Sequence, residues 1–269
     1  MKKPAKLAAW DRTKGRPEPI RALNRIPEVD NQEPLVNLLE YTPRIKLARD
    51  SVIPYVRKTV AEMCTTAAES LPEGVTLGLI EGWRPFARQQ RIYAFMWKCA
   101  KEAFPDRDHA ALRRTVCRWV APVDQKAPPG HCTGAAVDVV LLNENNEPFD
   151  VTSPYERWTA SRTYTLGLTP MAQANRDLLV NAMLGAGFSN CRDEWWHYSY
   201  GDAGWAVRAN RDRCFYGLVH LPEELYAELE LEHAAAMDGR PNPFMEPTAA
   251  TYPEKDPESE LLMDETVLE

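Results

Sequence analysis

The sequence has no apolar run long enough to cross a bilayer. No part of its 269 residues approaches the roughly 20 apolar residues that a membrane helix needs. The segment from Met1 to Trp10 contains lysines, but it lacks the apolar run of a secretory signal. We therefore expect a cytoplasmic protein that has no membrane partner.

Positive charge and paired cysteines are also scarce. Lysine and arginine total 32 against 39 acidic residues, which gives a formal net charge of −7 at pH 7. The lack of a broad basic surface argues against nucleic acid as the main partner. No Cys-x-x-Cys pair occurs, so we expect free and mostly buried thiols, as in a reducing compartment. The six cysteines are Cys64, Cys99, Cys117, Cys132, Cys191 and Cys214.

The chain is long enough to bury one sizeable core. We expect a single domain over residues 33–238. Residues 1–32 are basic and contain several prolines, which predicts an extended arm or a peripheral wrap. Residues 239–269 are acidic and rich in proline, a composition typical of a disordered tail. The sequence sets no oligomeric state.

Apolar periodicity predicts a mixture of helices and strands. In residues 51–71 the apolar side chains recur at helical spacing, with Pro54 in the first turn. Residues 135–142 are so apolar and β-branched that they predict an interior strand. Further helices are expected over residues 86–103, 108–119, 170–186 and 222–237, and further strands over 75–80 and 188–200. A turn at 201–204 is expected to join the last strand to a partner strand at 205–207 as a hairpin.

Four side chains have the chemistry and spacing of a zinc hydrolase. His131 and Asp138 are followed, about sixty residues later, by Glu194 and His197. Catalytic zinc usually takes three nitrogen or oxygen ligands from the protein and leaves a fourth position to water. We predict that His131, Asp138 and His197 bind one Zn²⁺ per chain. Glu194 is predicted to act as the general base that takes a proton from this water.

Each of these residues also has a structural alternative. Either histidine could be an ordinary hydrogen-bonded histidine, and Glu194 could be a salt-bridge partner. Asp138 lies within an apolar strand, where an unpaired carboxylate is costly, and this favours a metal ligand. Residues three apart point to opposite faces of a flat strand. A bulge or a strong twist is therefore expected if Glu194 and His197 serve one metal ion.

Other potential ligands are interpreted as structural residues. The side chain of Cys132 is expected to point away from that of His131, because the two are neighbours in an extended segment. The remaining histidines are expected on the surface or on helices: His109, His220 and His233.

Several short segments carry a resemblance to a known family. They are Gly82-Trp83-Arg84-Pro85, His131-Cys132-Thr133-Gly134-Ala135-Ala136-Val137-Asp138, Pro148-Phe149-Asp150, Asn181-Ala182-Met183, Gly187-Phe188, Glu194-Trp195-Trp196-His197-Tyr198 and Tyr200-Gly201-Asp202. With these motifs the chain resembles the D-alanyl-D-alanine dipeptidases of the vancomycin-resistance type, within the larger group of zinc D,D-peptidases. The resemblance covers roughly Val75 to Val207, about half of the chain.

The resemblance implies an α+β fold of the Hedgehog/D,D-peptidase kind, in which a small antiparallel sheet carries the zinc site and helices pack outside. It implies hydrolysis of D-alanyl-D-alanine or a similar D,D-dipeptide, with Glu194 as general base and then general acid. Arg84 would point into the site and stabilise the oxyanion, although it could instead pair with Glu81. Asp150 would help to receive the ammonium group of the substrate, although Pro-Phe-Asp is also ordinary turn chemistry.

Tyr200 and Asp202 are expected to build the turn that positions His197, behind the metal ligands themselves. Pro129 is a departure from the family, which often has a serine at this place, two positions before the first ligand. The usual Asn-Phe-x-Gly stretch of the family is also not matched in the first third of the chain.

Two other functions stay open. Pro129 favours a D,D-carboxypeptidase that trims D-alanine from the stem peptides of peptidoglycan, whereas the lack of an export signal argues against it. The second alternative is a catalytically silent, zinc-stabilised binding module. Such a module has no need of a proton shuttle, so Glu194 and Arg84 argue against it.

Overall fold

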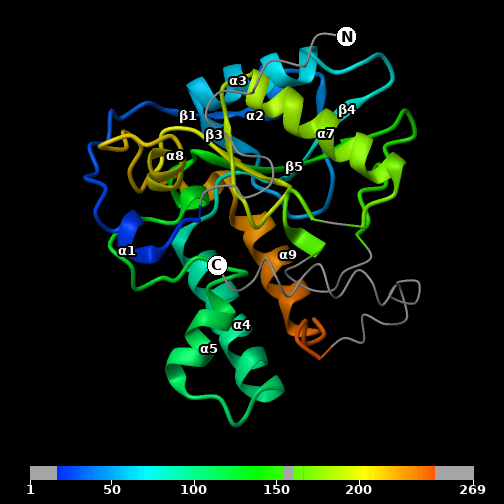
Figure 1. Cartoon of the computed structure of the whole chain (residues 1–269). Helices are drawn as coiled ribbons and strands as arrows, with labels where there is room; N and C mark the ends of the chain where they lie inside the picture. The colour runs from blue at the N-terminus through cyan, green and yellow to red at the C-terminus, as the bar shows by residue number, and fades with distance from the viewer. Residues whose placement is uncertain (1–16, 154–159, 166, 246–269) are drawn as a thin grey trace.

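A mixed five-stranded sheet forms the centre of the molecule (Figure 1). The structure is a computed structural model, and it describes residues 17–153, 160–165 and 167–245. Three strand pairs are antiparallel, and β2 lies parallel to β4 at one edge. The α+β class is confirmed, with this parallel edge pair in an otherwise antiparallel sheet. The strand order is β2 (Ile45–Leu47), β4 (Thr76–Glu81), β5 (Ala136–Leu142), β7 (His197–Ser199) and β6 (Ser189–Asn190).

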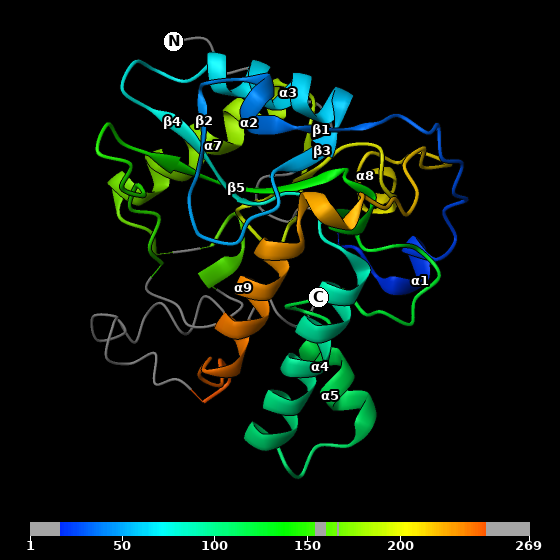
Figure 2. The ribbon, with the colours of Figure 1, turned by 180° about the vertical axis from the view of Figure 1, so that it is seen from behind.

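Helices cover both faces of this sheet, as Figure 1 and Figure 2 show from opposite sides. On one face lie α2 (Leu38–Tyr41), α3 (Lys58–Glu69) and α7 (Pro170–Gly185). On the other face lie α4 (Phe86–Ala103) and α9 (Ala227–Asp238), and α4 extends away from the body together with α5 (His109–Val116). No helix in the described part of the chain has both the length and the apolar character that would let it cross a membrane.

Side chains of β5 point alternately to the hydrophobic core and to the candidate site. Successive side chains of a strand point to opposite faces. Val137, Val139 and Leu141 join the main apolar core, together with residues of α3 such as Val60 and Cys64. Asp138 therefore points to the opposite face, away from this core. The hydrophobic face of β5 thus determines the direction in which the carboxylate points.

The segment that precedes α3 is not helical, contrary to the expectation for residues 51–71. Tyr55–Arg57 forms β3, which pairs antiparallel with β1 (Leu35–Asn37), and the helix begins only at Lys58. Pro54 lies before this strand, not in the first turn of a helix, and its carbonyl accepts a hydrogen bond from Leu38 N at 2.7 Å. Pairing with a distant segment has overridden the local helical periodicity.

The expected strand at 205–207 is also wrong. Ala203–Arg208 forms helix α8, because Asp202 caps its amino terminus by accepting a hydrogen bond from Trp205 N at 2.7 Å. The hairpin lies earlier, between β6 and β7. Within the expected strand 188–200, only Ser189–Asn190 and His197–Ser199 are extended strands, and the residues between them form the connecting turn.

The other boundaries agree more closely with the sequence. α4 has the expected bounds, and α7 and β5 differ from theirs by one residue. α9 begins at Ala227, later than expected, after the 3-10 turn η2 (Glu223–Leu225). The six cysteines are free, and four of them are buried, as expected. The described part of the expected arm, residues 17–32, wraps against the domain and contains α1 (Ile20–Leu23).

Candidate metal centre

The register of β5 against β7 brings Asp138 and His197 together. Asp138 and His197 are direct partners in this antiparallel pair, so their side chains leave the same face of the sheet. Nδ1 of His197 lies 2.9 Å from Oδ1 of Asp138. On the other side of β5, Glu81 pairs with Asp138 at an irregularity in β4. Pairing of three strands therefore gathers polar groups that are far apart in the sequence.

His131 reaches the same place from a short 3-10 turn, η1 (Gly130–Thr133), which leads into β5. Gly134 ends this turn with φ +70°, a conformation that favours glycine, and an added Cβ would clash with Leu35. Nδ1 of His131 lies 3.0 Å from the carbonyl oxygen of Gly82. The backbone carbonyl can only accept, so Nδ1 carries the proton and Nε2 is free to face Asp138 at 3.3 Å.

His131, Asp138 and His197 form a group that could hold a metal ion, because their ligand atoms all lie within 4.8 Å of one another. Their side chains are largely buried, with exposed fractions of 8%, 12% and 15%. Burial alone would raise the pKa of the Asp138 carboxyl. The charges and hydrogen bonds of the two histidines outweigh burial and hold this pKa well below its usual range. An anionic carboxylate between two imidazoles is a suitable ligand set for a divalent cation.

Glu194 lies in the turn just before β7, and not within a strand. One of its carboxylate oxygens is 3.9 Å from Nδ1 of His197. The turn allows residues three apart to approach one centre, so the expected strand bulge is not needed. Burial raises the pKa of the Glu194 carboxyl well above its ordinary value, and the charges of Asp138 and Glu18 raise it further. A carboxyl with a raised pKa holds a proton more readily than an ordinary glutamate, which suits a group that both accepts and donates a proton.

Arg84 lines the same cavity as the metal group and also makes the pairing with Glu81 that was the alternative interpretation. It pairs with the buried Glu81 at 3.3 Å and donates a hydrogen bond to Gln89 at 2.7 Å, so the alternative pairing is realised. Burial opposes the charged form, but the charges of Glu81 and then Asp138 raise the pKa of Arg84 above its ordinary value. The guanidinium thus stays positive beside the carboxylate of the metal group.

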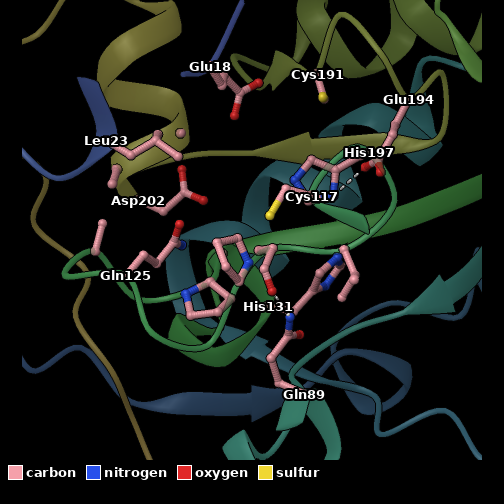
Figure 3. Close-up of a pocket in the computed structure, with 18 of the residues that line it drawn as sticks. Glu18, Leu23, Gln89, Cys117, Gln125, His131, Cys191, Glu194, His197 and Asp202 are labelled. Carbon is pink, nitrogen blue, oxygen red and sulfur yellow. Dashed lines mark hydrogen bonds and ion pairs between the residues drawn. The ribbon is translucent and has the colours of Figure 1, made fainter. Parts of the chain in front are cut away.

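A cavity of about 300 Å³ joins these side chains. His131, Asp138, His197, Glu194, Arg84 and Asp202 all line it, and Figure 3 shows the labelled members of this set around one hollow. Asp202 is placed there by the turn after β7. Its Oδ1 accepts hydrogen bonds from Ser199 Oγ and from Trp205 N, at 2.7 Å each.

Asp150 and Tyr200 do not line the cavity, although only Asp150 was expected to contact the substrate. Asp150 is exposed and is not among the residues that line the cavity; its carboxylate accepts a hydrogen bond from Thr152 N at 2.9 Å. This contact is the turn chemistry that was the alternative interpretation. Tyr200 does not line the cavity either, and instead stacks edge-on with Trp205 and Phe215. It supports the segment after β7 from the core side.

The other histidines and Cys132 do not join the metal group in the described part of the chain. His109 and His220 are exposed, and His233 is buried on helix α9, so all three lie on the surface or on helices, as expected. Sequence reasoning missed Glu18 and Arg208, which form an ion pair beside the cavity. Glu18 stands in a proline-rich segment that carries no motif, so no local signal could have revealed it.

Comparison with known proteins agrees with these features. Residues 47–216 match the model of the peptidase M15 family, described as D-Ala-D-Ala dipeptidase. A D-alanyl-D-alanine dipeptidase of Synechocystis sp. is 28% identical over an alignment of 228 residues, and this alignment covers 72% of this chain and 92% of the relative. A D-alanyl-D-alanine dipeptidase of Escherichia coli is 28% identical over 144 residues, which are 53% of this chain and 64% of the relative.

Proposed function

Because the chain belongs to the peptidase M15 family of D-Ala-D-Ala dipeptidases, we propose that it hydrolyses D-alanyl-D-alanine or a similar D,D-dipeptide to free amino acids with one bound Zn²⁺. The observation that carries the proposal is the convergence of His131, Asp138 and His197 at one wall of a cavity that Glu194 and Arg84 also line. Metal ligands, an acid–base group and a cation thus share one space.

The ligand set fits zinc. Two imidazole nitrogens and one carboxylate oxygen are ligands that zinc accepts, and three protein ligands are typical of a catalytic site. The contact of His131 with the carbonyl of Gly82 orients the ring, as the outer partner of a zinc-bound histidine commonly does. A bound Zn²⁺ supplies Lewis acidity, which polarises a carbonyl group and lowers the pKa of water to roughly 7.

Glu194 and Arg84 would perform the steps that the protein itself contributes. Glu194 takes a proton from the attacking water on a carboxylate oxygen and then delivers it to the leaving amine. Arg84, held by Glu81 and Gln89, stabilises the negative charge that develops on the oxygen of the scissile carbonyl. Its fixed position avoids reorganisation during the reaction, because its partners are already in place.

The test compares the D,D-dipeptide with a dipeptide of opposite stereochemistry and with a longer peptide that has the same end group. Metal-free protein is reconstituted with one equivalent of Zn²⁺ and incubated with D-alanyl-D-alanine, L-alanyl-L-alanine and a stem pentapeptide that ends in D-alanyl-D-alanine, and released alanine is quantified. We expect release from the D,D-dipeptide alone, and only with metal. Release from the pentapeptide with the dipeptide intact would instead identify a D,D-carboxypeptidase. If no substrate releases alanine although zinc is bound, the protein is a binding module.

A further inference from the structure

A carboxylate behind the cavity holds the cation that lines it. The side chain of Glu81 is 2% exposed, and its oxygens lie 2.7, 3.3 and 3.8 Å from the guanidinium groups of three arginines, which are Arg49, Arg84 and Arg88. Of these four residues, Arg84 alone lines the cavity beside the metal group. Arg49 keeps access to water, with an exposed fraction of 37%, whereas Arg88 is fully buried at 0%. One carboxylate therefore faces more positive charge than it can neutralise.

A second carboxylate, on α9, neutralises Arg88. Nε of Arg88 donates a hydrogen bond to Oε2 of Glu230 at 2.7 Å, and Nη2 donates to the backbone carbonyl of Leu229 at 3.1 Å. Arg91 also donates to Oε1 of Glu230. Burial raises the pKa of the Glu230 carboxyl, but the hydrogen bonds of the two arginines outweigh burial and hold this pKa below its usual range. Glu230 therefore stays anionic between α4 and α9, which lie side by side on one face of the sheet (Figure 2).

Arg84 and Arg88 compete for the same oxygen of Glu81. Nε of Arg84 is 3.4 Å from Oε1 of Glu81, and Nη1 of Arg88 is 3.8 Å from this atom. Burial lowers the pKa of Arg88, and the charge of Arg84 lowers it further, because the two guanidinium groups repel each other. If Glu230 lost its charge, Glu81 would be the counter-ion left to Arg88 among the described residues. A buried charge without a partner is costly, so Arg88 would move towards Glu81 and displace Arg84 from it.

Helix α9 also contacts the segment of Arg84 at a second point. Tyr226, directly before α9, packs edge-on against Trp83, with the ring centroids 5.1 Å apart. Trp83 is the neighbour of Arg84 in the chain. The whole of α9 lies beyond residues 47–216, which match the family model. The surroundings of Arg84 therefore include a helix that the family match does not contain.

We propose that Glu230 is a positioning residue for Arg84. It neutralises Arg88, so the carboxylate of Glu81 remains available to hold Arg84 in the cavity. The inference rests on the proposed function, in which Arg84 stabilises the charge on the oxygen of the scissile carbonyl. Neither Glu230 nor Arg88 lines the cavity, so both act through Arg84 and not through the substrate. Helix α9 thus contributes to the rate of the reaction from outside the site.

The first test is the kinetics of Glu230→Gln, measured per folded, zinc-loaded molecule with the D,D-dipeptide. We expect kcat to fall by about 10-fold, less than the 10²- to 10³-fold of a deleted oxyanion donor, because Arg84 is displaced and not removed. KM should stay within about 2-fold of the wild type, because the charge on the scissile oxygen develops only in the transition state. The control is Glu232→Gln, the same change at an exposed position of α9, which should keep both wild-type constants.

The second test removes the competing charge. In the Arg88→Met background no guanidinium of residue 88 competes with Arg84 for Glu81, so addition of Glu230→Gln should change kcat by less than about 2-fold. If α9 instead acted only through its contact with Arg88, the single variant Arg88→Met would already show the full loss of kcat. A role of Glu230 in stability alone would lower the melting temperature of Glu230→Gln and leave its kcat unchanged.

The inference would be overturned by an unchanged kcat in Glu230→Gln, or by an equal loss of kcat in the wild-type and Arg88→Met backgrounds. Both outcomes would leave the proposed function standing, because the wild type would still cleave the dipeptide. If Glu230→Gln does not fold, the pair Arg88→Met and Arg88→Met/Glu230→Gln decides, since a lower kcat in the double variant would contradict the competition. Failure of the wild type to cleave the dipeptide would contradict the proposed function and this inference together.

Discussion

At His131, one backbone contact decides which ring nitrogen can act as a ligand. The carbonyl oxygen of Gly82 accepts a hydrogen bond from Nδ1 of His131, so Nε2 faces Asp138. Gly82 lies at the exit of β4, within the same short segment as Arg84. One turn of the chain therefore orients a predicted metal ligand and also supplies the cation beside it. This coupling gives the Gly82-Trp83-Arg84-Pro85 segment a physical role beyond that of a turn.

Replacement of Glu194 by glutamine should separate metal binding from turnover. The amide has nearly the shape of the carboxylate but cannot take up a proton, so kcat is expected to fall by about 10²- to 10⁴-fold, the usual contribution of a general base. Zinc content, measured by atomic absorption, should stay at one ion per chain, because Glu194 is not among the predicted ligands. Glu62→Gln provides the control and should keep full activity. Retention of activity in Glu194→Gln would refute the assigned base.

His233 has no part in the site, but it should affect stability. It lies on α9 with Nδ1 3.4 Å from Nη2 of Arg91. Burial, and next the charge of Arg88, lower its pKa from 6.5 to about 4. Below pH 6.5 the unfolded chain therefore binds a proton at this position more readily than the folded chain does. Protonation thus favours unfolding as the pH falls towards 4.

The free energy of unfolding should therefore fall between pH 6.5 and pH 4, with His233 contributing on the order of 1–3 kcal/mol of the loss. His233→Gln cannot be protonated, so urea unfolding measured across this range should show a smaller loss than the wild type. His220→Gln, at an exposed position, should follow the wild-type curve. Identical pH dependence in His233→Gln and the wild type would contradict this assignment.

At the scale of elements, the centre depends on the pairing of β5 with β7 and on the turn that connects β7 to α8. Register alone places His197 opposite Asp138. The chain then turns through Asp202, whose Oδ1 holds the hydroxyl of Ser199 and the first turn of α8 together. The end of β7 and the start of α8 are therefore joined by one carboxylate. Substitution of Asp202 should therefore alter the position of His197, because both residues are connected through β7.

Asp202→Ala removes this cap and should lower the free energy of unfolding by about 1–2 kcal/mol. Zinc affinity, measured by competition with a chelator, should also fall, because β7 loses its support. Asp108→Ala is the matched control: Asp108 caps α5 through the backbone N–H of Ala111 at 2.7 Å, outside the cavity. The Asp108→Ala variant should lose a similar free energy of unfolding but keep the zinc affinity of the wild type. Equal zinc affinity in both variants would show that Asp202 has no positioning role.

At the scale of the whole molecule, the candidate site ties together three distant parts of the chain. The metal group comes from η1, β5 and β7, and the segment around Glu18 closes the opposite wall of the cavity. An ion bound by this group would hold these parts in their native arrangement. The unfolded chain has no such arrangement, so the ion should bind the folded state preferentially and stabilise it.

Removal of the metal should therefore lower the melting temperature of the whole domain. With free Zn²⁺ at about 1,000 times its dissociation constant, binding stabilises the folded state by about 4 kcal/mol. Thermal unfolding of chelated protein, followed by addition of Zn²⁺, measures the difference. Asp138→Asn removes the anionic ligand, so its melting temperature should no longer respond to Zn²⁺. An undiminished response in this variant would place the metal elsewhere.

The sequence by itself determined the elements and the chemistry that depend on local information. Helix periodicity indicated α4 to the residue, proline at the start and glycines at the end indicated α7 to within one residue, and the apolar run 135–142 indicated β5. A carboxylate inside that run was evidence for a partner, because burial of an unpaired charge is costly. The spacing of Glu194 and His197 likewise indicated a site, because a general base and a ligand of one metal ion must lie close together.

Tertiary structure decided everything that depends on contacts between distant segments. Residues 55–57 were expected in a helix, but they pair with β1 and form β3. Residues 205–207 were expected in a strand, but they belong to α8, which Asp202 caps. Asp150 was expected in the site and lies outside the cavity, whereas Glu18 was not expected and lines it. Local periodicity reports which face of a segment is buried, but it contains no information about which segment covers that face. That choice depends on packing and register summed over the whole chain.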